Sequence, residues 1–296
     1  MAGLYTDVSL DGKDSIRLLK FAQPQQHSVI ELELITASLS TEPEYRALSY
    51  AWEAPFGNPS LDQDGYYGVQ EHVIEVNGGS LHVTKNLLQA LLVLRGNPRI
   101  NSGHFWVDAI SINQSDVDEK DEQIKIMAKI FRKASRVLVW LGEADSSTES
   151  AMALMEAICR LTPEQRYDLT PRTVTVDRMN SHIESRFRTV DGWRPLARFF
   201  CRRYFKRAWV VQEILSANST PVVLCGEHKL DWSKLLTTSE YLATSPWGRL
   251  FRQLGFTGIE GGSEPHHADP AKLAATTRNK LDAHDNVIVY LSLIHI

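Results

Sequence analysis

The sequence predicts an α/β domain built around a parallel sheet with helices on its faces. Residues 105–110 and 137–141 are short, nearly continuous apolar runs, which are typical of strands buried on both faces of a parallel sheet. Between them, residues 119–134 carry an apolar stripe at helical spacing, made of Ile124, Met127, Ala128 and Phe131. A strand, a helix and a strand within ~37 residues form a βαβ unit, whose two strands are expected to run parallel.

Further strands are expected before this unit. Residues 29–35 alternate apolar and acidic side chains, which predicts a strand with one solvent-facing side, and residues 46–51 form a second apolar strand. Residues 72–83 contain two β-prone runs around Asn77 and Gly78. This pair favours a hairpin turn, because both turn positions need positive φ. The sequence therefore predicts an N-terminal β-hairpin in addition to the parallel sheet.

The remaining elements are predicted from periodicity and from turn residues. Thr84 is placed to cap a helix that runs to about Arg95. Residues 149–161 and 195–217 are expected to be helical, the second with a break near Arg203, and residues 221–225 to form a strand. Segments rich in polar residues, glycine or proline are expected to be an insertion and a loop, at 162–185 and 245–270.

Composition narrows the class of protein. The formal net charge is −4, so the chain as a whole does not favour binding to nucleic acid. The three cysteines are widely spaced, which argues against a zinc site or a disulfide framework and favours a reducing compartment. The N-terminus lacks a secretory signal, and no apolar run reaches the ~18 residues that span a bilayer. We therefore expect a cytoplasmic protein with no metal and no membrane segment.

Polar residues occur where the predicted strands end, and ligands of open parallel sheets bind beyond the carboxyl ends of the strands. Trp52 follows the strand at 46–51, and Asp108 is expected inside the strand at 105–110. Asp108 either binds a ligand or holds loop amides at the strand end. Asn113 and Gln114, in the next loop, either donate hydrogen bonds to a ligand or stabilise the turn.

A second candidate group lies in the stretch RAWVVQE, which runs from Arg207 to Glu213. On a helix, Trp209 and Glu213 are four residues apart and share a face. A carboxylate beside a large aromatic ring is partly desolvated, which raises its pKa and suits proton transfer or the stabilisation of a cation. The alternative is a core tryptophan next to a glutamate that pairs with Arg207 or Lys206.

A basic segment precedes this stretch. Residues 186–207 hold eight lysines and arginines against the single acid Asp191. Such a segment can meet phosphates, or it can form a solvated helix face or a partner surface. Aromatic residues interleave with the basic ones, and their spacing favours a place in the core: Phe199, Phe200, Tyr204 and Phe205.

Several motifs, taken in order, resemble the HET (heterokaryon incompatibility) domain of filamentous fungi. They read YRALSYAW from Tyr45, WVDAISINQ from Trp106, VWLG from Val139 and RAWVVQE from Arg207. The chain departs from the family where it has Ser111 in place of the usual cysteine and Glu53 in place of glycine. The resemblance implies an extension at 1–28, a HET domain at 29–235 with core motifs at 45–217, and a C-terminal region at 236–296 that is expected to be truncated.

The resemblance implies a role in vegetative incompatibility, in which fusion of unlike hyphae triggers programmed cell death. It also implies a distant likeness to TIR domains, which share a flavodoxin-like parallel sheet. Some TIR domains cleave NAD with a helix glutamate in a W-x-x-x-E pattern, and Trp209 and Glu213 have that spacing. NAD is then a substrate rather than a resident cofactor, with Glu213 as the catalytic residue and a binding set of Trp52, Asp108, Asn113, Gln114 and Trp209.

Two other classes of function stay open at this point. The first is a non-enzymatic signalling module that kills by associating with copies of itself or with a protein that carries a recognition module. Its contact surface is expected at the basic, aromatic segment 194–207, where Arg202 and Arg203 are the residues to reverse in charge. The second is a nucleic-acid binder that uses the same segment, which the net negative charge disfavours.

Overall fold

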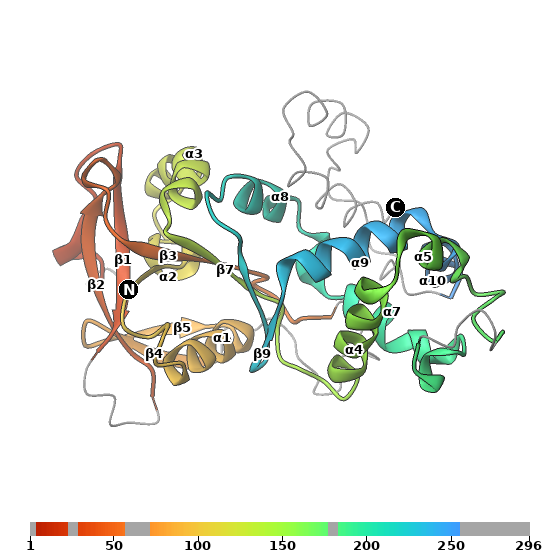
Figure 1. Ribbon diagram of the computed structural model, residues 1–296. Helices are drawn as coiled ribbons and strands as arrows, with labels where there is room; N and C mark the ends of the chain where they lie inside the picture. The colour runs from red at the N-terminus through yellow and green to blue at the C-terminus, as the bar shows by residue number, and fades with distance from the viewer. Residues whose placement is uncertain (1–3, 23–28, 57–71, 177–182, 255–296) are drawn as a thin grey trace. The chain divides into compact units, whose positions relative to one another are not determined.

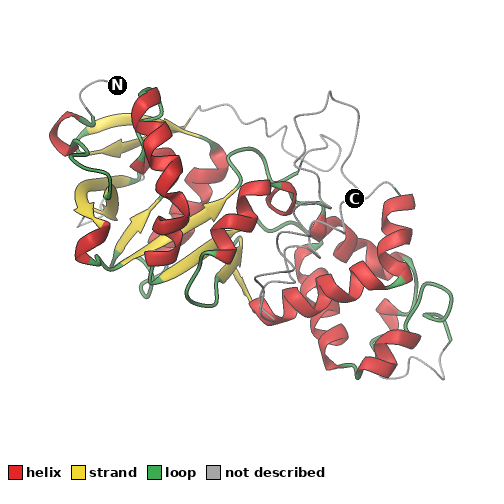
Figure 2. Cartoon of the chain, turned by 90° about the horizontal axis from the view of Figure 1, so that it is seen from above, coloured by secondary structure: helices red, strands yellow, loops and turns green. Residues whose placement is uncertain are grey.

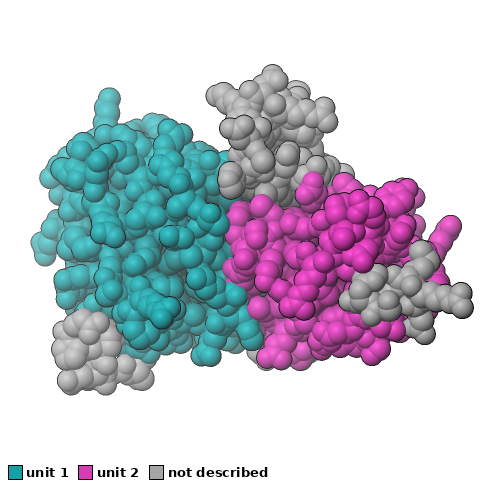
Figure 3. Space-filling view, viewed as in Figure 1, with its two compact units in different colours: residues 1–55, 62–143, 207–229 teal, residues 56–61, 144–206, 230–296 magenta. Residues whose placement is uncertain are grey.

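The computed structural model describes residues 4–22, 29–56, 72–176 and 183–254. The chain divides into two compact units, shown in different colours in Figure 3. The first, called here the α/β unit, comprises Met1–Pro55, Asp62–Glu143 and Arg207–Lys229. The second, called here the helical unit, comprises Phe56–Leu61, Ala144–Lys206 and Leu230–Ile296.

Within the described residues, nine strands form one sheet in the order β5-β4-β2-β1-β6-β3-β7-β8-β9. The sheet combines antiparallel and parallel pairs and is flanked by helices, which confirms the predicted α/β class. The strands are β1 Ser15–Phe21, β2 Glu31–Ser38, β3 Tyr45–Tyr50, β4 His72–Val76, β5 Gly79–Val83, β6 His104–Trp106, β7 Arg136–Trp140, β8 Val222–Cys225 and β9 His228–Leu230.

Four neighbouring strands, β6, β3, β7 and β8, pair in parallel, and β2 and β4 form a separate parallel pair. The predicted βαβ unit is present, but β3 lies between its two strands and pairs in parallel with both. After β3 the chain forms the hairpin of β4 and β5 and then α1, and it continues to β6 on one side of β3 and to β7 on the other. The winding of these parallel strands therefore reverses at β3, and ligands of open parallel sheets bind at the carboxyl ends of strands beside such a reversal.

The antiparallel part contains one strand that the sequence did not reveal. Strand β1 lies between β2 and β6 and pairs antiparallel with both, although it falls inside the expected extension 1–28. Its apolar pattern is interrupted by Arg17, which is nevertheless 1% exposed. The hairpin of β4 and β5 is confirmed, with φ of 49° at Asn77 and 75° at Gly78.

Helices cover both faces of the sheet in the α/β unit (Figure 1). On one face, α1 (Lys85–Gly96) packs its apolar residues against Leu48 and Tyr50 of β3. Because side chains alternate along a strand, Ser49 points to the opposite face, where it meets α8 (Ala208–Leu215). That second face also carries α3 (Val117–Lys133), whereas α2 (Asp108–Ser111) buries Ile110 in the same apolar cluster as α1.

Side chains cap the starts of α1 and α3, the first of them by Thr84 as predicted. The Thr84 hydroxyl accepts a hydrogen bond from the backbone N–H of Leu87 at 3.3 Å, at the start of α1. Asp116 accepts from the N–H of Glu119 at 3.0 Å and begins α3. The buried face of α3 is rotated from the predicted stripe, since its buried residues are Gln123, Met127, Ile130 and Phe131.

The helical unit contains α4 (Thr148–Arg160), α5 (Pro163–Asp168), α7 (Arg194–Phe200), α9 (Trp232–Thr244) and α10 (Pro246–Gln253), drawn in red in Figure 2. Its core includes Trp193 and Trp247, whose rings stack with centroids 3.7 Å apart. The prediction of a loop at 245–270 is wrong at its start, where residues 246–253 form the helix α10. Residues 255–270 lie outside the described residues. The expected break near Arg203 is confirmed, because a 3-10 helix (Arg203–Lys206) separates α7 from α8.

Short 3-10 helices complete the described structure, at Thr6–Val8, Leu39–Thr41, Ser185–Phe187 and Asp191–Trp193. The expected insertion at 162–185 includes α5, which starts with a capping box between Thr162 and Gln165. Within the described ranges, every helix is too short or too polar to cross a bilayer.

Candidate functional site

Asp108 lies just past the carboxyl end of β6, rather than inside a strand as the sequence suggested. Strand β6 ends at Trp106, and Asp108 is the first residue of α2. One carboxylate oxygen accepts a hydrogen bond from the backbone N–H of Ala109 at 2.7 Å. The other accepts from the indole Nε1 of Trp52 at 2.8 Å. The structure thus joins the loop after β3 to the start of α2 through two predicted site residues.

The carboxyl group of Asp108 is harder to ionise than a free aspartate. Burial among protein atoms raises its pKa, while the hydrogen bond from Trp52 and the positive charge of Arg207 oppose that rise. The Tyr50 hydroxyl also forms a hydrogen bond with this carboxyl group. Tyr50 is 2% exposed, so its phenol is held in place by the core and in turn restrains the carboxyl group of the half-buried Asp108.

Glu213, on α8, is a second carboxyl group at the same end of the sheet and is 4% exposed. The Ser49 hydroxyl donates a hydrogen bond to its Oε2 atom. Burial raises the pKa of Glu213 to about 7, against the lowering effects of Arg207 and Ser49. The negative charge of Asp108 adds to the rise. A carboxyl group with such a pKa exchanges its proton near neutral pH, as general acid–base catalysis requires.

Arg207 interacts through its charge with both carboxyl groups. It is the residue before α8, and its guanidinium donates a hydrogen bond to the carbonyl oxygen of Tyr50. Its Nη2 atom lies 4.0 Å from Oε1 of Glu213. The charge of Arg207 lowers the pKa of both Asp108 and Glu213. Side chains from β3, its following loop, α2 and α8 thus form the acid–arginine cluster, defined as Ser49, Tyr50, Trp52, Asp108, Arg207 and Glu213.

Trp209 does not share a buried helix face with Glu213, although their spacing suggested that it would. Its side chain is 47% exposed, whereas Glu213 on the same helix is 4% exposed. Trp209 is therefore not a core residue, and the burial of Glu213 comes from the body of the unit beneath α8. The alternative interpretation was right about the pairing of Glu213 with Arg207 and wrong about a core tryptophan.

The two residues of the following loop have distinct contacts. The Gln114 side chain donates to the carbonyl oxygen of Asp108 at 2.9 Å, so it supports α2 close to the cluster. The side-chain Oδ1 atom of Asn113 accepts from the backbone N–H of Ser115 at 3.2 Å, and the backbone N–H of Asn113 donates to the Glu119 carboxylate. Asn113 therefore stabilises the turn into α3, as one of its two interpretations proposed.

Sequence reasoning singled out Asp108, Trp52 and Glu213 but gave no role to Ser49 and Tyr50. One signal was available, because Ser49 is a polar residue inside the apolar strand 46–51 and is 1% exposed. A buried hydroxyl needs a hydrogen-bonding partner, and here the partner is Glu213.

Most of the basic segment 194–207 is buried or half-buried, although Arg194 at its start is exposed, so the segment is not the continuous exposed surface that the sequence suggested. Arg202 is 0% exposed, and its guanidinium lies over the rings of Phe56 and Phe199 at 4.9 and 5.0 Å. Arg198 forms an ion pair with Asp145 at 2.7 Å. The interleaved aromatic residues are all buried, which confirms their predicted place in the core: Phe199, Phe200, Tyr204 and Phe205.

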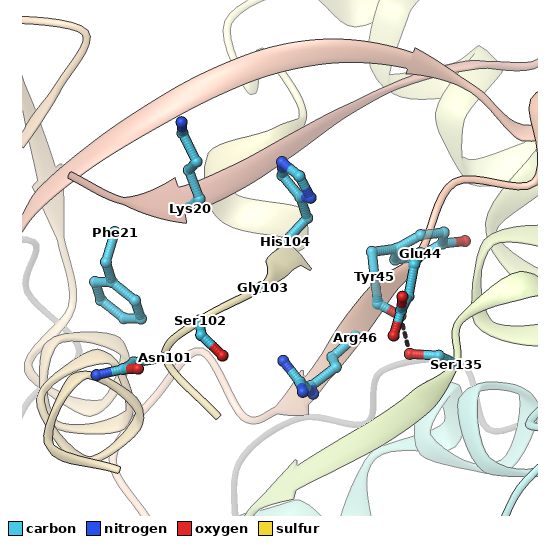
Figure 4. Close-up of a pocket in the computed structure, with 10 residues that line it drawn as sticks. All are labelled: Lys20, Phe21, Glu44, Tyr45, Arg46, Asn101, Ser102, Gly103, His104 and Ser135. Atoms are coloured by element: carbon cyan, nitrogen blue, oxygen red, sulfur yellow. Dashed lines mark hydrogen bonds between the residues drawn. The ribbon is translucent and has the colours of Figure 1, made fainter. Parts of the chain in front are cut away.

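A pocket of about 450 Å³ lies at the other end of β3, between its amino end and that of β6 (Figure 4). Lys20 and His104 lie on one side of the strands, whereas Phe21 and Arg46 lie on the other. The basic side chains that line the pocket already have partners, since Lys20 forms an ion pair with Glu33 at 2.8 Å and Arg46 donates a hydrogen bond to a backbone carbonyl at 3.0 Å. The chemistry-bearing groups therefore gather at the carboxyl ends instead. No metal-binding group of three or more His, Cys, Asp or Glu residues occurs in the described ranges.

These features define an α/β domain whose candidate site is a pair of carboxyl groups and an arginine at the carboxyl ends of parallel strands. Residues 45–213 match the family model described as "Heterokaryon incompatibility protein (HET)". The chain belongs to this family. The matched region begins with β3 and ends at Glu213, so it includes every member of the acid–arginine cluster.

A curated relative is also named for heterokaryon incompatibility. Heterokaryon incompatibility protein 6, OR allele, of Neurospora crassa is 26% identical over 221 residues. The similarity covers 65% of this chain and 30% of the relative, so the chain spans less than a third of that protein's length. No solved structure matches the chain.

Proposed function

We propose that this chain is an effector domain of fungal self/non-self recognition, which triggers programmed cell death in the cytoplasm when unlike hyphae fuse. Membership of the HET family supports this role, as does the similarity to a Neurospora crassa protein named for heterokaryon incompatibility. The relative is more than three times as long as the matched part, so a recognition function on another segment or another protein would supply the trigger.

The acid–arginine cluster is the site of this activity, and the reaction is hydrolysis of the N-glycosidic bond of NAD. Cleavage breaks the bond between the ribose C1′ atom and nicotinamide, and the bonding electron pair leaves with nicotinamide. The ribosyl group then carries oxocarbenium-like positive charge, which a nearby carboxylate stabilises. A water molecule completes the reaction by adding its oxygen to C1′ and giving up one proton. The observation that carries this proposal is the buried Glu213, with its pKa of about 7.

The neighbouring residues have complementary roles. Ionised Glu213 stabilises the ribosyl cation and takes the proton of the attacking water, which a carboxylate with a pKa near 7 does well at neutral pH. The half-buried Asp108 accepts hydrogen bonds from the ribose hydroxyls. An aromatic face for nicotinamide comes from Trp52, whose indole is anchored on Asp108, or from the exposed Trp209. NAD is the substrate, and no resident cofactor is needed.

Expression in a fungal host tests this proposal, with viability and cellular NAD followed after induction. We expect the parent chain to reduce both, and Glu213→Gln to reduce neither. Glu240→Gln is the matched control, because Glu240 is an exposed glutamate on α9. Killing by the parent chain without loss of NAD would contradict the enzymatic proposal and favour a self-associating module. In that case its surface would have to lie outside Arg202, which is buried.

A further inference from the structure

The loop that follows β3, residues 51–55, carries Trp52 and is fixed by hydrogen bonds from the side chain of Asn86. Asn86 lies in the first turn of α1 and is 1% exposed. Its side-chain Nδ2 group donates hydrogen bonds to the carbonyl oxygens of Ala51 at 2.7 Å and Glu53 at 3.2 Å. These two carbonyls flank Trp52 in the sequence. One buried amide therefore fixes the backbone on both sides of the indole.

The orientation of the Asn86 amide is itself determined by its surroundings. Its Oδ1 atom accepts a hydrogen bond from the indole Nε1 of Trp140 at 2.8 Å. An indole N–H can only donate, so the amide oxygen must face Trp140 and the amide nitrogen must face the loop. Trp140 ends β7 and is 1% exposed, which makes it a fixed reference point.

The other end of the loop rests on Gly142. This glycine has φ of +98°, a conformation that residues with a side chain rarely adopt. A Cβ atom at this position would lie 2.4 Å from Cγ and 2.7 Å from Cβ of Pro55. The carbonyl oxygen of Gly142 accepts from the N–H of Gly226 at 2.8 Å, which ties it to the chain after β8. Pro55 therefore sits directly on the glycine backbone, with no room for a side chain between them.

We propose that Asn86 and Gly142 are positioning residues, which hold the loop 51–55 so that Trp52 directs its indole N–H at the carboxylate of Asp108. Neither residue belongs to the acid–arginine cluster, and both act through Trp52. The hydrogen bond from Trp52 opposes the effect of burial on the pKa of Asp108, so the position of the loop also influences the charge of that group. The catalytic consequence rests on the proposed NAD hydrolysis, whereas the structural relationship stands without it.

Fluorine NMR of the full chain labelled with 5-fluorotryptophan tests the structural part. The chain has seven tryptophans, and Trp52→Phe identifies the resonance of Trp52 by its loss. In Asn86→Asp a carboxylate oxygen faces the carbonyls of Ala51 and Glu53, so the loop shifts. In Gly142→Ala the new methyl group displaces Pro55. We expect both variants to move the Trp52 resonance, while those of Trp193 and Trp247 in the helical unit stay in place.

Two matched variants serve as controls. Asn101→Asp removes another donor to a backbone carbonyl, that of Arg95 at 3.0 Å, away from the loop. Gly96→Ala adds a methyl group where nothing lies within 4 Å. Both should leave the Trp52 resonance unchanged. Thermal melting shows which variants are folded, and Asn86→Ser replaces Asn86→Asp if the latter does not fold. An unmoved Trp52 resonance in folded Asn86 and Gly142 variants would overturn the inference.

Kinetics test the functional part. We expect the folded variants at Asn86 and Gly142, like Trp52→Phe, to show a KM for NAD raised roughly tenfold with a smaller change in kcat. A moved Trp52 resonance with unchanged KM and kcat would overturn the role of these residues in positioning the site. Absence of nicotinamide release by the parent protein would refute the proposed reaction instead, and the NMR result would still decide whether Asn86 and Gly142 position Trp52.

Discussion

The hydroxyl of Ser49 donates a hydrogen bond to the carboxyl group of Glu213, which lies 164 residues further along the chain. Both side chains are almost fully buried, at 1% and 4% exposure. The contact joins the centre of the parallel sheet to α8, on the face of β3 opposite α1. A buried carboxyl group is costly unless it is protonated, hydrogen-bonded or paired, and Glu213 combines a raised pKa with both kinds of partner.

The first prediction concerns the pH dependence of stability. The pKa of Glu213 rises from 4.5 to about 7 on folding, so the folded protein holds this proton more tightly than the unfolded chain. The stability that this group contributes is therefore fully present below about pH 4.5 and is lost as the pH rises through about 7. A shift of this size corresponds to on the order of 3 kcal/mol. Glu213→Gln, which stays neutral, should not show this loss.

Urea unfolding at about pH 5 and about pH 8 measures the effect. The free energy of unfolding of the parent protein should fall relative to that of Glu213→Gln between the two conditions. Glu240→Gln, at an exposed position, should follow the parent protein. Parallel pH profiles for the parent protein and Glu213→Gln would show that the pKa of Glu213 is not raised.

The second prediction concerns the donor itself. Ser49→Ala removes the hydroxyl that lowers the pKa of Glu213, so this pKa should rise further. The variant should lose about 1–3 kcal/mol of unfolding free energy above pH 7, where Glu213 is charged, and less at about pH 5. Ser239→Ala is the control, because the buried Ser239 hydroxyl donates to a neutral carbonyl at 2.8 Å. Its cost should not depend on pH, and an equally pH-independent cost for Ser49→Ala would contradict the account.

The third prediction concerns Arg207, which lowers the pKa of both carboxyl groups. Arg207→Gln should raise both values, so the acid limb of the pH–rate profile for nicotinamide release should move to higher pH. Arg207→Lys keeps the positive charge but not the planar guanidinium that reaches the carbonyl oxygen of Tyr50. The pH–rate profile of Arg207→Lys should lie between those of the parent protein and Arg207→Gln. An unchanged profile in Arg207→Gln would show that Arg207 does not influence the catalytic carboxyl groups.

The fourth prediction tests the place of the basic segment. Arg202→Glu puts a negative charge into the core of the helical unit beside Phe56 and Phe199, so it should destabilise the protein by roughly 3–5 kcal/mol. Arg194→Glu, at an exposed site, should change the unfolding free energy by less than about 1 kcal/mol. Thermal or urea unfolding makes the comparison. Equal stability of the two variants would return Arg202 to the surface as a candidate contact residue.

Much of the fold could be predicted from local patterns. Continuous apolar runs indicated β6 and β7, helical spacing indicated α3, and Asn77 with Gly78 indicated the hairpin. Strand β1 was not predicted, because Arg17 interrupts its apolar run. That arginine is satisfied by a bidentate ion pair with Glu119, at 2.6 and 2.9 Å, which no local pattern reveals. The order of the strands could not be predicted either, because the periodicity of a sequence carries no information that places β3 between β6 and β7.

The candidate site shows the same division. Trp52, Asp108 and Glu213 could be named from their sequence, but their partners could not. Trp52 meets Asp108 across 56 residues, and Ser49 meets Glu213 across 164. Such contacts depend on how the parallel strands are ordered, so only the folded structure reveals them. The spacing of Trp209 and Glu213 was a true helical spacing, yet burial separated the two side chains into an exposed one and a buried one.

The most direct test of the central claim is nicotinamide release from NAD by the purified full chain, measured at neutral pH beside Glu213→Gln. We expect release by the parent protein at high concentration, and its loss in a Glu213→Gln protein that thermal melting shows to be folded. Equal release by the two proteins, or no release by a folded and concentrated parent protein, would contradict the central claim. Glu213 would then be a structural partner of Ser49 and Arg207 rather than a catalytic carboxylate.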